Sequence, residues 1–205
     1  MIKEQRLFVF DLEGVLFPEI WPAVAAAFSL PELTATTRDF PDYDLLMRHR
    51  LACLESSSLG LSDLLSVIAG LDALPGAVEL LDRLRATAPV LILSDTFEQF
   101  LPPVSAKLHY PSVLCHRLIL REDRIIGYKL RLPDQKRAAV EAFQRLNYSV
   151  IAIGDSFNDL SMLHAADTGF LVDPPESIRE AHPIFPVSGS VRDLAEHLHR
   201  LLPGT

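Results

Sequence analysis

The sequence predicts a doubly wound α/β fold, in which a mostly parallel sheet carries a small helical cap inserted after the first strand. Three observations lead to this prediction. Short apolar runs have the length of strands, helix-period segments alternate with them from about residue 76 onward, and residues from about 16 to 74 show helical patterns without a convincing strand. A chain of 205 residues suits one medium domain, or a core with a small insertion.

Four segments are expected to form the parallel strands. Each is rich in β-branched or aromatic residues, and each is followed by polar residues. Continuous apolar runs of this length are typical of strands that are covered on both faces. The four segments are Leu7–Phe10, Val90–Leu93, Val150–Ile153 and Phe170–Val172. Residues 113–132 instead alternate with a period of two and break at Arg121–Arg124, which predicts a β-hairpin.

Helices are expected in two groups. The core helices are Gly76–Arg85, Gln135–Leu146 and Ser190–Leu202, and the helices of the insertion are Trp21–Phe28, Asp42–Glu55 and Ser62–Leu71. The last core helix opens with the capping-box variant Ser190-x-x-Asp193. Asp134 is expected to cap the N-terminus of the helix Gln135–Leu146. Prolines, including Pro102–Pro103, are assigned to turns. The expected division is a core of residues 1–15 and 75–205 and a cap of residues 16–74.

Composition excludes several classes of protein. With 19 basic and 27 acidic residues the net charge is −8, which argues against a protein that coats nucleic acid. The longest apolar run, Ala23–Phe28, has six residues, whereas a membrane-spanning helix needs about 20. Cys53 and Cys115 form no CxxC pair, so we expect two reduced thiols. A cytoplasmic protein without a membrane or nucleic-acid partner is expected, and a homodimer is compatible with the sequence.

Of the polar residues that follow the four predicted strands, those after three strands are candidates for one shared site. Because the carboxyl ends of parallel strands form the ligand-binding edge of such a sheet, we expect these side chains to meet there. A strand-end Asp taken singly is most simply a helix cap. Clustered carboxylates raise one another's pKa, and a hard divalent cation with oxygen ligands removes that cost. Three coincidences in one order favour a Mg²⁺ site built from Asp11 and Glu13, Ser94 and Asp95, and Asp155, Asn158 and Asp159.

Lys136 falls in the first turn of a predicted helix, where a cation opposes the helix dipole. The simple interpretation is a solvated surface lysine, and Arg137 next to it fits that description better. The functional interpretation is that Lys136 points to an anion at the sheet edge, where the helix N-terminus also offers main-chain N–H groups.

Taken in order, these segments resemble the four motifs of the haloacid dehalogenase superfamily, whose core is Rossmann-like. The motifs are Asp11-Leu-Glu13-Gly-Val15, Ser94-Asp-Thr96, Lys136 and Gly154-Asp-Ser-Phe-Asn158-Asp159. The last is the most specific, and the resemblance covers nearly the whole chain. Glu13 departs from the superfamily's commoner Asp-x-Asp. The chain is similar to bacterial phosphoserine phosphatases that also transfer phosphate to homoserine. The residues that carry this similarity are Glu13 and the segments Pro18–Trp21, Thr36–Asp39, Pro41–Asp44 and Leu93–Phe97.

The resemblance implies Mg²⁺-dependent hydrolysis of O-phosphoserine through an aspartyl-phosphate, with homoserine as a phosphate acceptor besides water. Asp11 is then the nucleophile, Glu13 the general acid and base, and Lys136 the cation that neutralises the reacting pair. The implied metal ligands are Asp11, the main-chain carbonyl of Glu13 and Asp155, with Asp159 either as a further ligand or as a residue that supports the ligands.

The resemblance also implies how the substrate is bound. Ser94 donates to a phosphate oxygen, Asn158 positions the substrate or a loop, and Asp95 is a further substrate-binding residue. Glu19 binds the substrate ammonium, and Arg50 binds its carboxylate. Arg38 is a rival for Arg50, and a charge near a helix start explains Glu19 equally well. On the predicted helix, Arg50 shares a stripe with Leu46, Met47 and Leu54, so it is expected to face inward.

Other functions remain as alternatives at this point. A phosphatase of another small phosphorylated metabolite uses the same motifs. A receiver domain of a response regulator also places acids, a Ser or Thr and a Lys around Mg²⁺, but the cap-sized insertion and the last motif argue against it. A nicotinamide-binding enzyme is disfavoured because no GxGxxG sequence follows the first strand.

Overall fold

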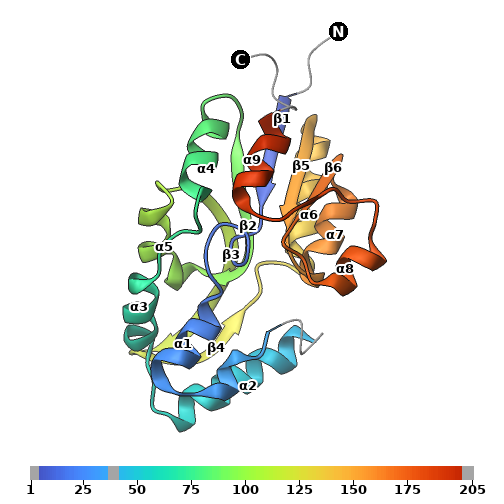
Figure 1. Ribbon diagram of the computed structural model, residues 1–205. Coiled ribbons are helices and arrows are strands. Elements are labelled where there is room, and N and C mark those ends of the chain that lie inside the picture. Colours follow the sequence, from blue (N-terminus) through green and yellow to red (C-terminus); the bar gives the residue numbers. More distant parts are fainter. Residues whose placement is uncertain (1–4, 37–41, 200–205) are drawn as a thin grey trace.

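A seven-stranded sheet forms the centre of the computed structural model, which describes residues 5–36 and 42–199 (Figure 1). Neighbouring strands are parallel, except that β4 runs antiparallel to β3 at one edge. The order across the sheet is β4-β3-β2-β1-β5-β6-β7. The strands are β1 (Gln5–Phe10), β2 (Val90–Phe97), β3 (Ser112–Arg121), β4 (Arg124–Lys129), β5 (Tyr148–Gly154), β6 (Thr168–Val172) and β7 (Val187–Ser188). The predicted doubly wound α/β fold is therefore confirmed.

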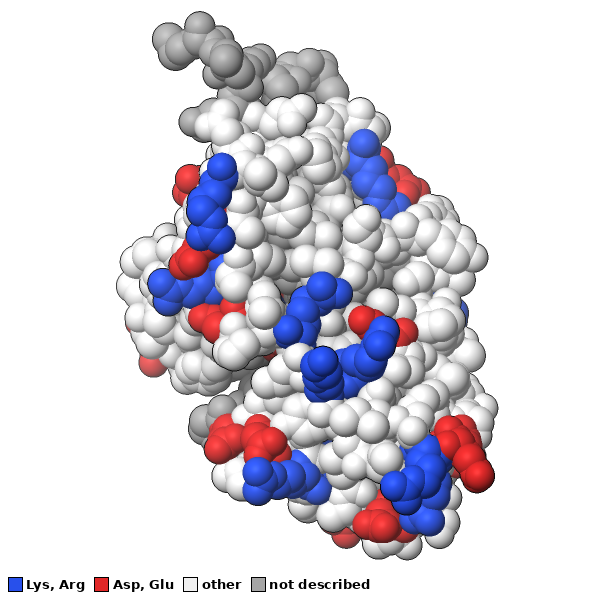
Figure 2. Space-filling model, turned by 180° about the vertical axis from the view of Figure 1, so that it is seen from behind, with Lys and Arg blue, Asp and Glu red and all other residues white. Residues whose placement is uncertain are grey.

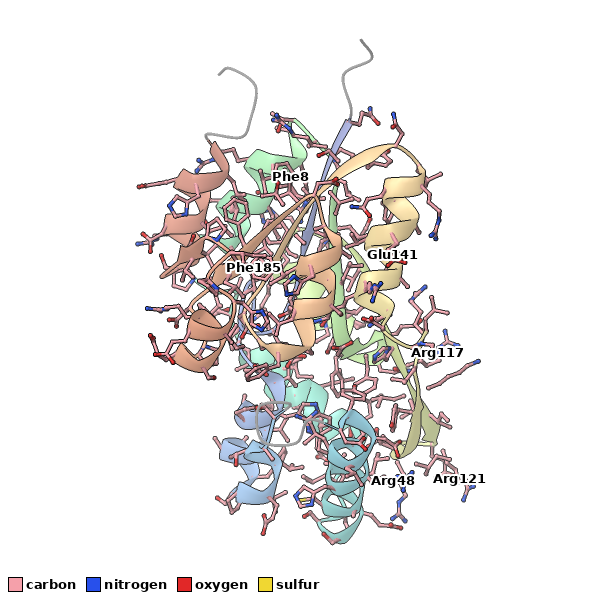
Figure 3. All side chains as sticks on the ribbon, turned by 90° about the vertical axis from the view of Figure 1, so that its right-hand side faces the viewer. Phe8, Arg48, Arg117, Arg121, Glu141 and Phe185 are labelled. Carbon is pink, nitrogen blue, oxygen red and sulfur yellow. The ribbon has the colours of Figure 1, made fainter. Side chains whose placement is uncertain are left out.

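Helices cover both faces of this sheet because successive residues of the buried strands point to opposite sides. Phe8 and Phe10 pack in one layer with α4 (Ala77–Arg85), α5 (Leu101–Lys107) and α9 (Val191–His199). Leu7 and Val9 pack in the other layer with α6 (Gln135–Arg145), α7 (Leu160–Ala165) and α8 (Glu176–Ala181). Phe8 and Phe185, labelled in Figure 3, belong to these two layers.

Helical elements follow β1 and lie near the end of the sheet at which β1 finishes (Figure 1). They are α1 (Ile20–Phe28), the 3₁₀ turn η1 (Pro31–Thr34), α2 (Tyr43–Ser56) and α3 (Leu61–Gly70). On α2 the predicted stripe is buried, Arg50 included, whereas Arg48 and His49 are exposed. The inward direction expected for Arg50 is therefore confirmed.

The β3–β4 hairpin supports these helices. At its turn, the main-chain carbonyl of Asp123 accepts the N–H of Leu61 at 2.8 Å, and its carboxylate accepts the N–H of Ser62 at 2.9 Å. A Cβ on Gly60 would lie 2.0 Å from Asp123 Oδ2, so only glycine allows this approach. Because Asp123 satisfies main-chain donors at the start of α3, the hairpin fixes where this helix begins.

Several elements differ from the sequence prediction. β2 continues through Phe97, so Ser94 and Asp95 lie within the strand rather than after it, and its register with β3 shifts between Leu93 and Phe97. Pro102–Pro103 occupy the first turn of α5 and not a loop, because the first turn of a helix has no need of their missing N–H groups. The short elements α7, α8 and β7 were not predicted.

Charged side chains of both signs are interspersed on the face shown in Figure 2. Within residues 5–36 and 42–199, no single helix is both long and apolar enough to cross a membrane. The pair α2 and α3 passes that test only in combination, and a bend of 106° separates the two helices. Cys53 and Cys115 are both free thiols, as expected.

Candidate active site

Three buried carboxylates meet at the carboxyl ends of β1 and β5. Asp11 follows β1 directly, Asp155 follows β5, and Asp159 ends the 3₁₀ turn η3 (Phe157–Asp159). Each offers a carboxylate oxygen, and these oxygens all lie within 4.8 Å of one another. The three residues are only 4%, 2% and 0% exposed. The convergence expected from the sheet topology is thus present in the structure.

Two glycines make this close approach possible. Gly14 has a φ of +80°, and a Cβ at its position would lie 2.5 Å from Asp155 Oδ2. A Cβ on Gly154 would lie 2.4 Å from the Cβ of Asp159. Since real Cβ atoms do not approach other atoms so closely, a larger residue at either position would push the carboxylates apart. A steric requirement therefore explains why glycine stands at both positions.

Main-chain groups orient Asp159. Its Oδ2 accepts the N–H of Asp155 at 3.0 Å and the N–H of Ser156 at 3.2 Å. Its Oδ1 is left to face Lys136. A carboxylate that accepts main-chain N–H groups is held rigidly.

Lys136 connects the carboxylates. Its Nζ lies 2.8 Å from Asp11 Oδ1, 2.7 Å from Asp159 Oδ1 and 3.6 Å from Asp95 Oδ2. The side chain is almost fully buried, which alone would lower its pKa, but the three carboxylates outweigh burial and raise the pKa of Lys136 well above its usual value. The functional interpretation of Lys136 as an inward-pointing cation agrees with this geometry.

The predicted cap of α6 is wrong. Asp134 occupies the N-cap position with a φ of 45° and a ψ of 50°, and its side chain makes no capping hydrogen bond. Its Oδ1 accepts the hydroxyl of Ser161 at 2.7 Å. The left-handed backbone turns the Asp134 carboxylate away from the helix N–H groups and toward α7.

The single positive charge of Lys136 does not balance the negative charge of three clustered carboxylates. Burial, followed by repulsion from Asp159 and Asp155, raises the pKa of Asp11 well above its ordinary value despite the opposing effect of Lys136. An all-oxygen donor set with excess negative charge is the kind of site that binds a hard divalent cation. Asp11, Asp155 and Asp159 fit that role, and Glu13, whose main-chain carbonyl was the other expected ligand, lies on the turn that follows Asp11.

Glu13 points toward the helical insertion. Its Oε2 accepts the N–H of Ile20 at 2.9 Å, so Glu13, and not the N-cap residue Glu19, satisfies the start of α1. Loss of water around the carboxyl and the nearby negative charge of Glu19 raise the pKa of Glu13 to about 7. An acid with this pKa both donates and accepts protons near neutral pH.

Residues of the insertion and of the core line one small cavity of about 60 Å³. The Arg50 guanidinium lies 4.6 Å above the Trp21 ring and donates to the main-chain carbonyl of Ala35 at 3.0 Å. Burial lowers the pKa of Arg50 to about 10, so it stays charged. Its buried Nε has no hydrogen-bond partner in the described part of the chain. The cavity is lined by Asp11, Glu13, Glu19, Trp21, Thr36, Tyr43, Arg50, Ser94, Asp95, Thr96, Ser156 and Asn158.

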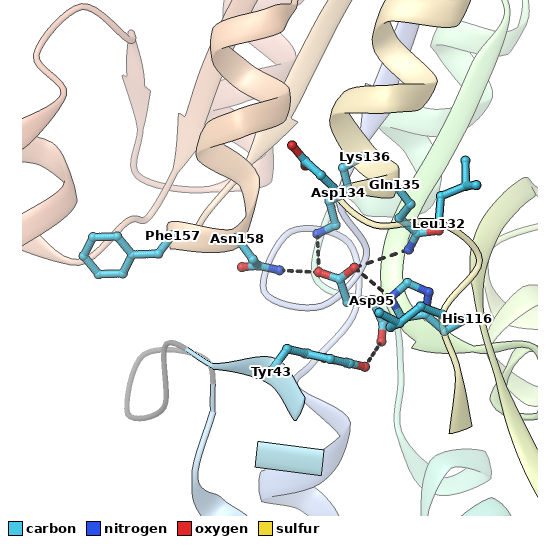
Figure 4. A pocket seen from close by; sticks show the side chains of 10 residues that line it. Tyr43, Asp95, His116, Leu132, Asp134, Gln135, Lys136, Phe157 and Asn158 are labelled. Atoms are coloured by element: carbon cyan, nitrogen blue, oxygen red, sulfur yellow. Dashed lines mark hydrogen bonds and ion pairs between the residues drawn. The ribbon is translucent and has the colours of Figure 1, made fainter. Parts of the chain in front are cut away.

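Asp95 has a different environment from the one expected of a substrate-binding residue. Its Oδ2 accepts Asn158 Nδ2 at 2.9 Å, and its Oδ1 lies 3.3 Å from both Gln135 Nε2 and His116 Nε2 (Figure 4). Burial favours the neutral acid, but Lys136, with His116 and Asn158, holds the pKa of Asp95 well below its usual range. The carboxylate is therefore engaged by protein groups.

The structure brings nearly all the predicted site residues together. The exception is Arg38, the rival for Arg50, which lies outside the described residues. Sequence reasoning missed His116 and Gln135. His116 belongs to the hairpin strand β3. It reaches Asp95 because the register between β2 and β3 shifts, and no sequence pattern predicts that shift. A second cavity of about 460 Å³ adjoins the first and shares Tyr43, Asp95 and Asn158 with it.

Known proteins are similar to this chain in sequence. A family model described as haloacid dehalogenase-like hydrolase matches residues 5–167. Phosphoserine phosphatase ThrH of Pseudomonas aeruginosa is 49% identical over 185 residues, which is 90% of each chain. A phosphoserine phosphatase of Pseudomonas syringae pv. tomato is 50% identical over 177 residues, or 86% of this chain and 75% of that protein.

Solved structures give the same fold at lower identity. A phospho-aspartyl intermediate analogue of phosphoserine phosphatase superposes with a TM-score of 0.78 at 19% identity, covering 95% of this chain and 99% of that one. A substrate-bound phosphoserine phosphatase complex gives a TM-score of 0.78 at 18% identity over the same shares. With the family match spanning most of the sequence and the carboxylates and lysine of its four motifs gathered at one sheet edge, the chain belongs to the haloacid dehalogenase-like hydrolase family.

Proposed function

We propose that this chain is a Mg²⁺-dependent phosphoserine phosphatase that works through an aspartyl-phosphate on Asp11. The observation that carries the proposal is the single cavity that joins Asp11 and Glu13 to the oppositely charged pair Glu19 and Arg50. Phosphoryl chemistry and recognition of a zwitterion then take place in one small space. The two curated relatives with about half of their residues identical, both phosphoserine phosphatases, support this choice of substrate.

In the first half of the reaction, a carboxylate oxygen of Asp11 attacks phosphorus and the bond from phosphorus to the serine oxygen breaks. Glu13 in its acid form gives a proton to the leaving oxygen, so serine departs as a neutral alcohol. Lys136 stays within hydrogen-bond distance of Asp11 and offsets the negative charge that gathers as the phosphate approaches. Ser94, buried at the carboxyl half of β2, is the proposed donor to a phosphate oxygen.

In the second half, water attacks the phosphorus of the aspartyl-phosphate and Asp11 leaves as a carboxylate. Glu13, now ionised, takes the proton of that water, which restores its acid form for the next cycle. A pKa of about 7 suits both directions of transfer. Asp11, Asp155 and Asp159 are the proposed protein ligands of Mg²⁺, together with the Glu13 carbonyl. When bound, the ion offsets phosphate charge and lets an anionic nucleophile approach.

Arg50 and Glu19 are the proposed contacts for the amino-acid part of the substrate. A planar guanidinium with a buried, unpartnered Nε (among the residues described) suits a carboxylate. Glu19 supplies the opposite charge for the ammonium. Homoserine carries the same ammonium and carboxylate as serine, so the same charged pair suits it. We propose that homoserine replaces water in some turnovers and leaves as phosphohomoserine.

The test is phosphate release from a panel of phosphomonoesters that contains O-phosphoserine, sugar phosphates, nucleotides and p-nitrophenyl phosphate, each with and without homoserine. Preference for O-phosphoserine, with phosphohomoserine detected by mass spectrometry, supports the proposal. Preference for another ester would assign the site to a different metabolite. Absence of phosphohomoserine would restrict the enzyme to hydrolysis.

A further inference from the structure

A second set of buried polar side chains surrounds Asp95, and the reaction scheme gives its histidine no role. His116 is 4% exposed, and its Nε2 lies 3.3 Å from Asp95 Oδ1 (Figure 4). Its other nitrogen, Nδ1, accepts the main-chain N–H of Arg131 at 3.2 Å. An imidazole nitrogen that accepts an N–H carries no proton, so this contact assigns the ring proton to Nε2, facing Asp95.

Asp95 in turn contacts two residues of the proposed mechanism. Its Oδ2 accepts Asn158 Nδ2 at 2.9 Å and lies 3.6 Å from Lys136 Nζ. His116 therefore touches no reacting atom but fixes the carboxylate that holds Lys136 and Asn158. The main chain of Asp95 is also fixed, because Tyr43 donates its hydroxyl to the Asp95 carbonyl at 2.9 Å.

We propose that His116 is a positioning residue for phosphoryl transfer, acting through its Nε2–H hydrogen bond to Asp95. Resting on the proposed function, the inference adds a residue from the β-hairpin to the catalytic apparatus. Without the hydrogen bond from His116, Asp95 Oδ1 keeps only its 3.3 Å contact with Gln135 Nε2. The carboxylate is then held less tightly, and so is the contact that it makes with Lys136. Small displacements of a group that stabilises charge lower the rate while leaving substrate binding largely intact.

A purely structural role for His116 is the competing explanation. The hydrogen bond from Arg131 holds the segment between β4 and α6 in place, and α6 is the helix that carries Lys136. Loss of this hydrogen bond would loosen that segment. The two nitrogens of His116 thus make two separable hydrogen bonds, one to Asp95 and one to Arg131. An experiment has to remove each of them alone.

Two amide variants make this separation. The amide of Asn reaches about as far as Nδ1, so His116→Asn keeps an acceptor for Arg131 and removes the donor to Asp95. The amide of Gln reaches about as far as Nε2, so His116→Gln keeps the donor to Asp95 and removes the acceptor. The matched control is His109→Asn. His109 lies on the loop before β3, at the end of that strand away from the hairpin turn, and its exposed side chain lies 2.9 Å from Asp82 of α4.

We expect His116→Asn to lower kcat at least about tenfold, with KM for phosphoserine changed less than about twofold. His116→Gln is expected to recover most of that loss, and His109→Asn to match the parent enzyme. The double variant with Asp95→Asn should lose no more kcat than Asp95→Asn alone, because His116 acts through Asp95. All assays are run well below each variant's melting temperature, measured by circular dichroism.

Equal losses in His116→Asn and His116→Gln, an unchanged kcat in His116→Asn, or additive losses in the double variant would overturn the proposal. If His116→Asn does not fold, His116→Leu, which removes both hydrogen bonds, takes its place. A kcat loss in His116→Leu that His116→Gln recovers supports the proposal, and equal losses in these two variants, or no loss in His116→Leu, contradict it. The same comparison is made with p-nitrophenyl phosphate. A parent enzyme that hydrolyses this ester but not phosphoserine refutes the proposed substrate, while the His116 comparison still decides the positioning role.

Discussion

Lys136 Nζ lies between Asp11 and Asp159, 2.8 Å from an oxygen of the first and 2.7 Å from an oxygen of the second, although 125 residues separate Lys136 from Asp11 in the chain. Helix α6 brings the lysine to the edge of the sheet at which β1 and β5 end. The contact unites three of the four family motifs, and it fixes the charge balance of the site, in which one cation faces several carboxylates.

Removal of this cation is expected to cost both stability and rate. Lys136→Met leaves Asp11 and Asp159 buried without their partner, and breaking a buried ion pair costs about 3–5 kcal/mol of unfolding free energy. Denaturant unfolding in chelator measures the loss. Added Mg²⁺ should restore part of it, because the ion replaces the missing positive charge.

The neighbouring Arg137→Met is the control for Lys136→Met, since Arg137 is exposed and pairs with Glu141 on the surface of α6. It should leave stability and kcat nearly unchanged. Equal effects of the two substitutions would remove Lys136 from the proposed mechanism.

Dependence on Mg²⁺ follows from the carboxylate cluster. Activity should disappear in chelator and return with Mg²⁺, and a Mg²⁺ concentration of 100 times its Kd should add about 2.7 kcal/mol to the unfolding free energy. Asp155→Asn should shift both titrations to higher Mg²⁺ concentration. Full activity in chelator would contradict a metal-assisted reaction.

Glu13→Gln tests the proton transfers. The Gln side chain keeps an acceptor for the Ile20 N–H, so the fold should survive, but it neither gives nor takes a proton. The kcat for phosphoserine should fall by about 10²–10⁴. With p-nitrophenyl phosphate, whose leaving group needs no proton, we expect a burst of one equivalent of p-nitrophenol followed by slow turnover.

A burst shows that phosphorylation of the enzyme is spared while attack by water is impaired. If Glu13→Gln has parent-like turnover on phosphoserine, Glu13 is not the acid and base. A slow reaction without a burst would assign Glu13 to positioning instead of proton transfer.

Arg50→Lys tests recognition of the substrate carboxylate. A lysine keeps the charge but loses the planar fork, which should cost about 1.5–3 kcal/mol in kcat/KM for phosphoserine. Hydrolysis of p-nitrophenyl phosphate, which has no carboxylate, should barely change. The control is Arg48→Lys, because Arg48 lies on the exposed face of the same helix. Losses of equal size on both substrates would show that Arg50 does not bind the carboxylate.

Much of the fold was predictable because its signals are local. The apolar strands, the alternation with helices and the Arg50 stripe depend on residue spacing, and the structure agrees with each. The extension of β2 through Ser94 and Asp95 was not predictable, since polar residues inside a strand resemble its end. The first turn of α5 was missed because Pro102–Pro103 are typical of loops as well as of helix starts.

In the site, too, the residues with local sequence signals were predictable and the others were not. The strand-end acids and Lys136 belong to short motifs that can be recognised from their order in the sequence. His116 and Gln135 have no such motif, because they reach Asp95 through a register shift and through the start of α6. Asp134 looked like a helix cap, but a left-handed backbone turns its side chain toward Ser161.

The central claim is that phosphate passes through a covalent bond to Asp11. Enzyme mixed with O-phosphoserine and Mg²⁺, quenched in acid within the first turnover and digested, should yield a peptide spanning Asp11 that is heavier by one phosphoryl group. The Asp11→Asn variant should show no such peptide and lose at least about 10³-fold in kcat with an unchanged circular dichroism spectrum. Phosphate release from Asp11→Asn at the parental rate, or a phosphorylated peptide that does not contain Asp11, would contradict the account.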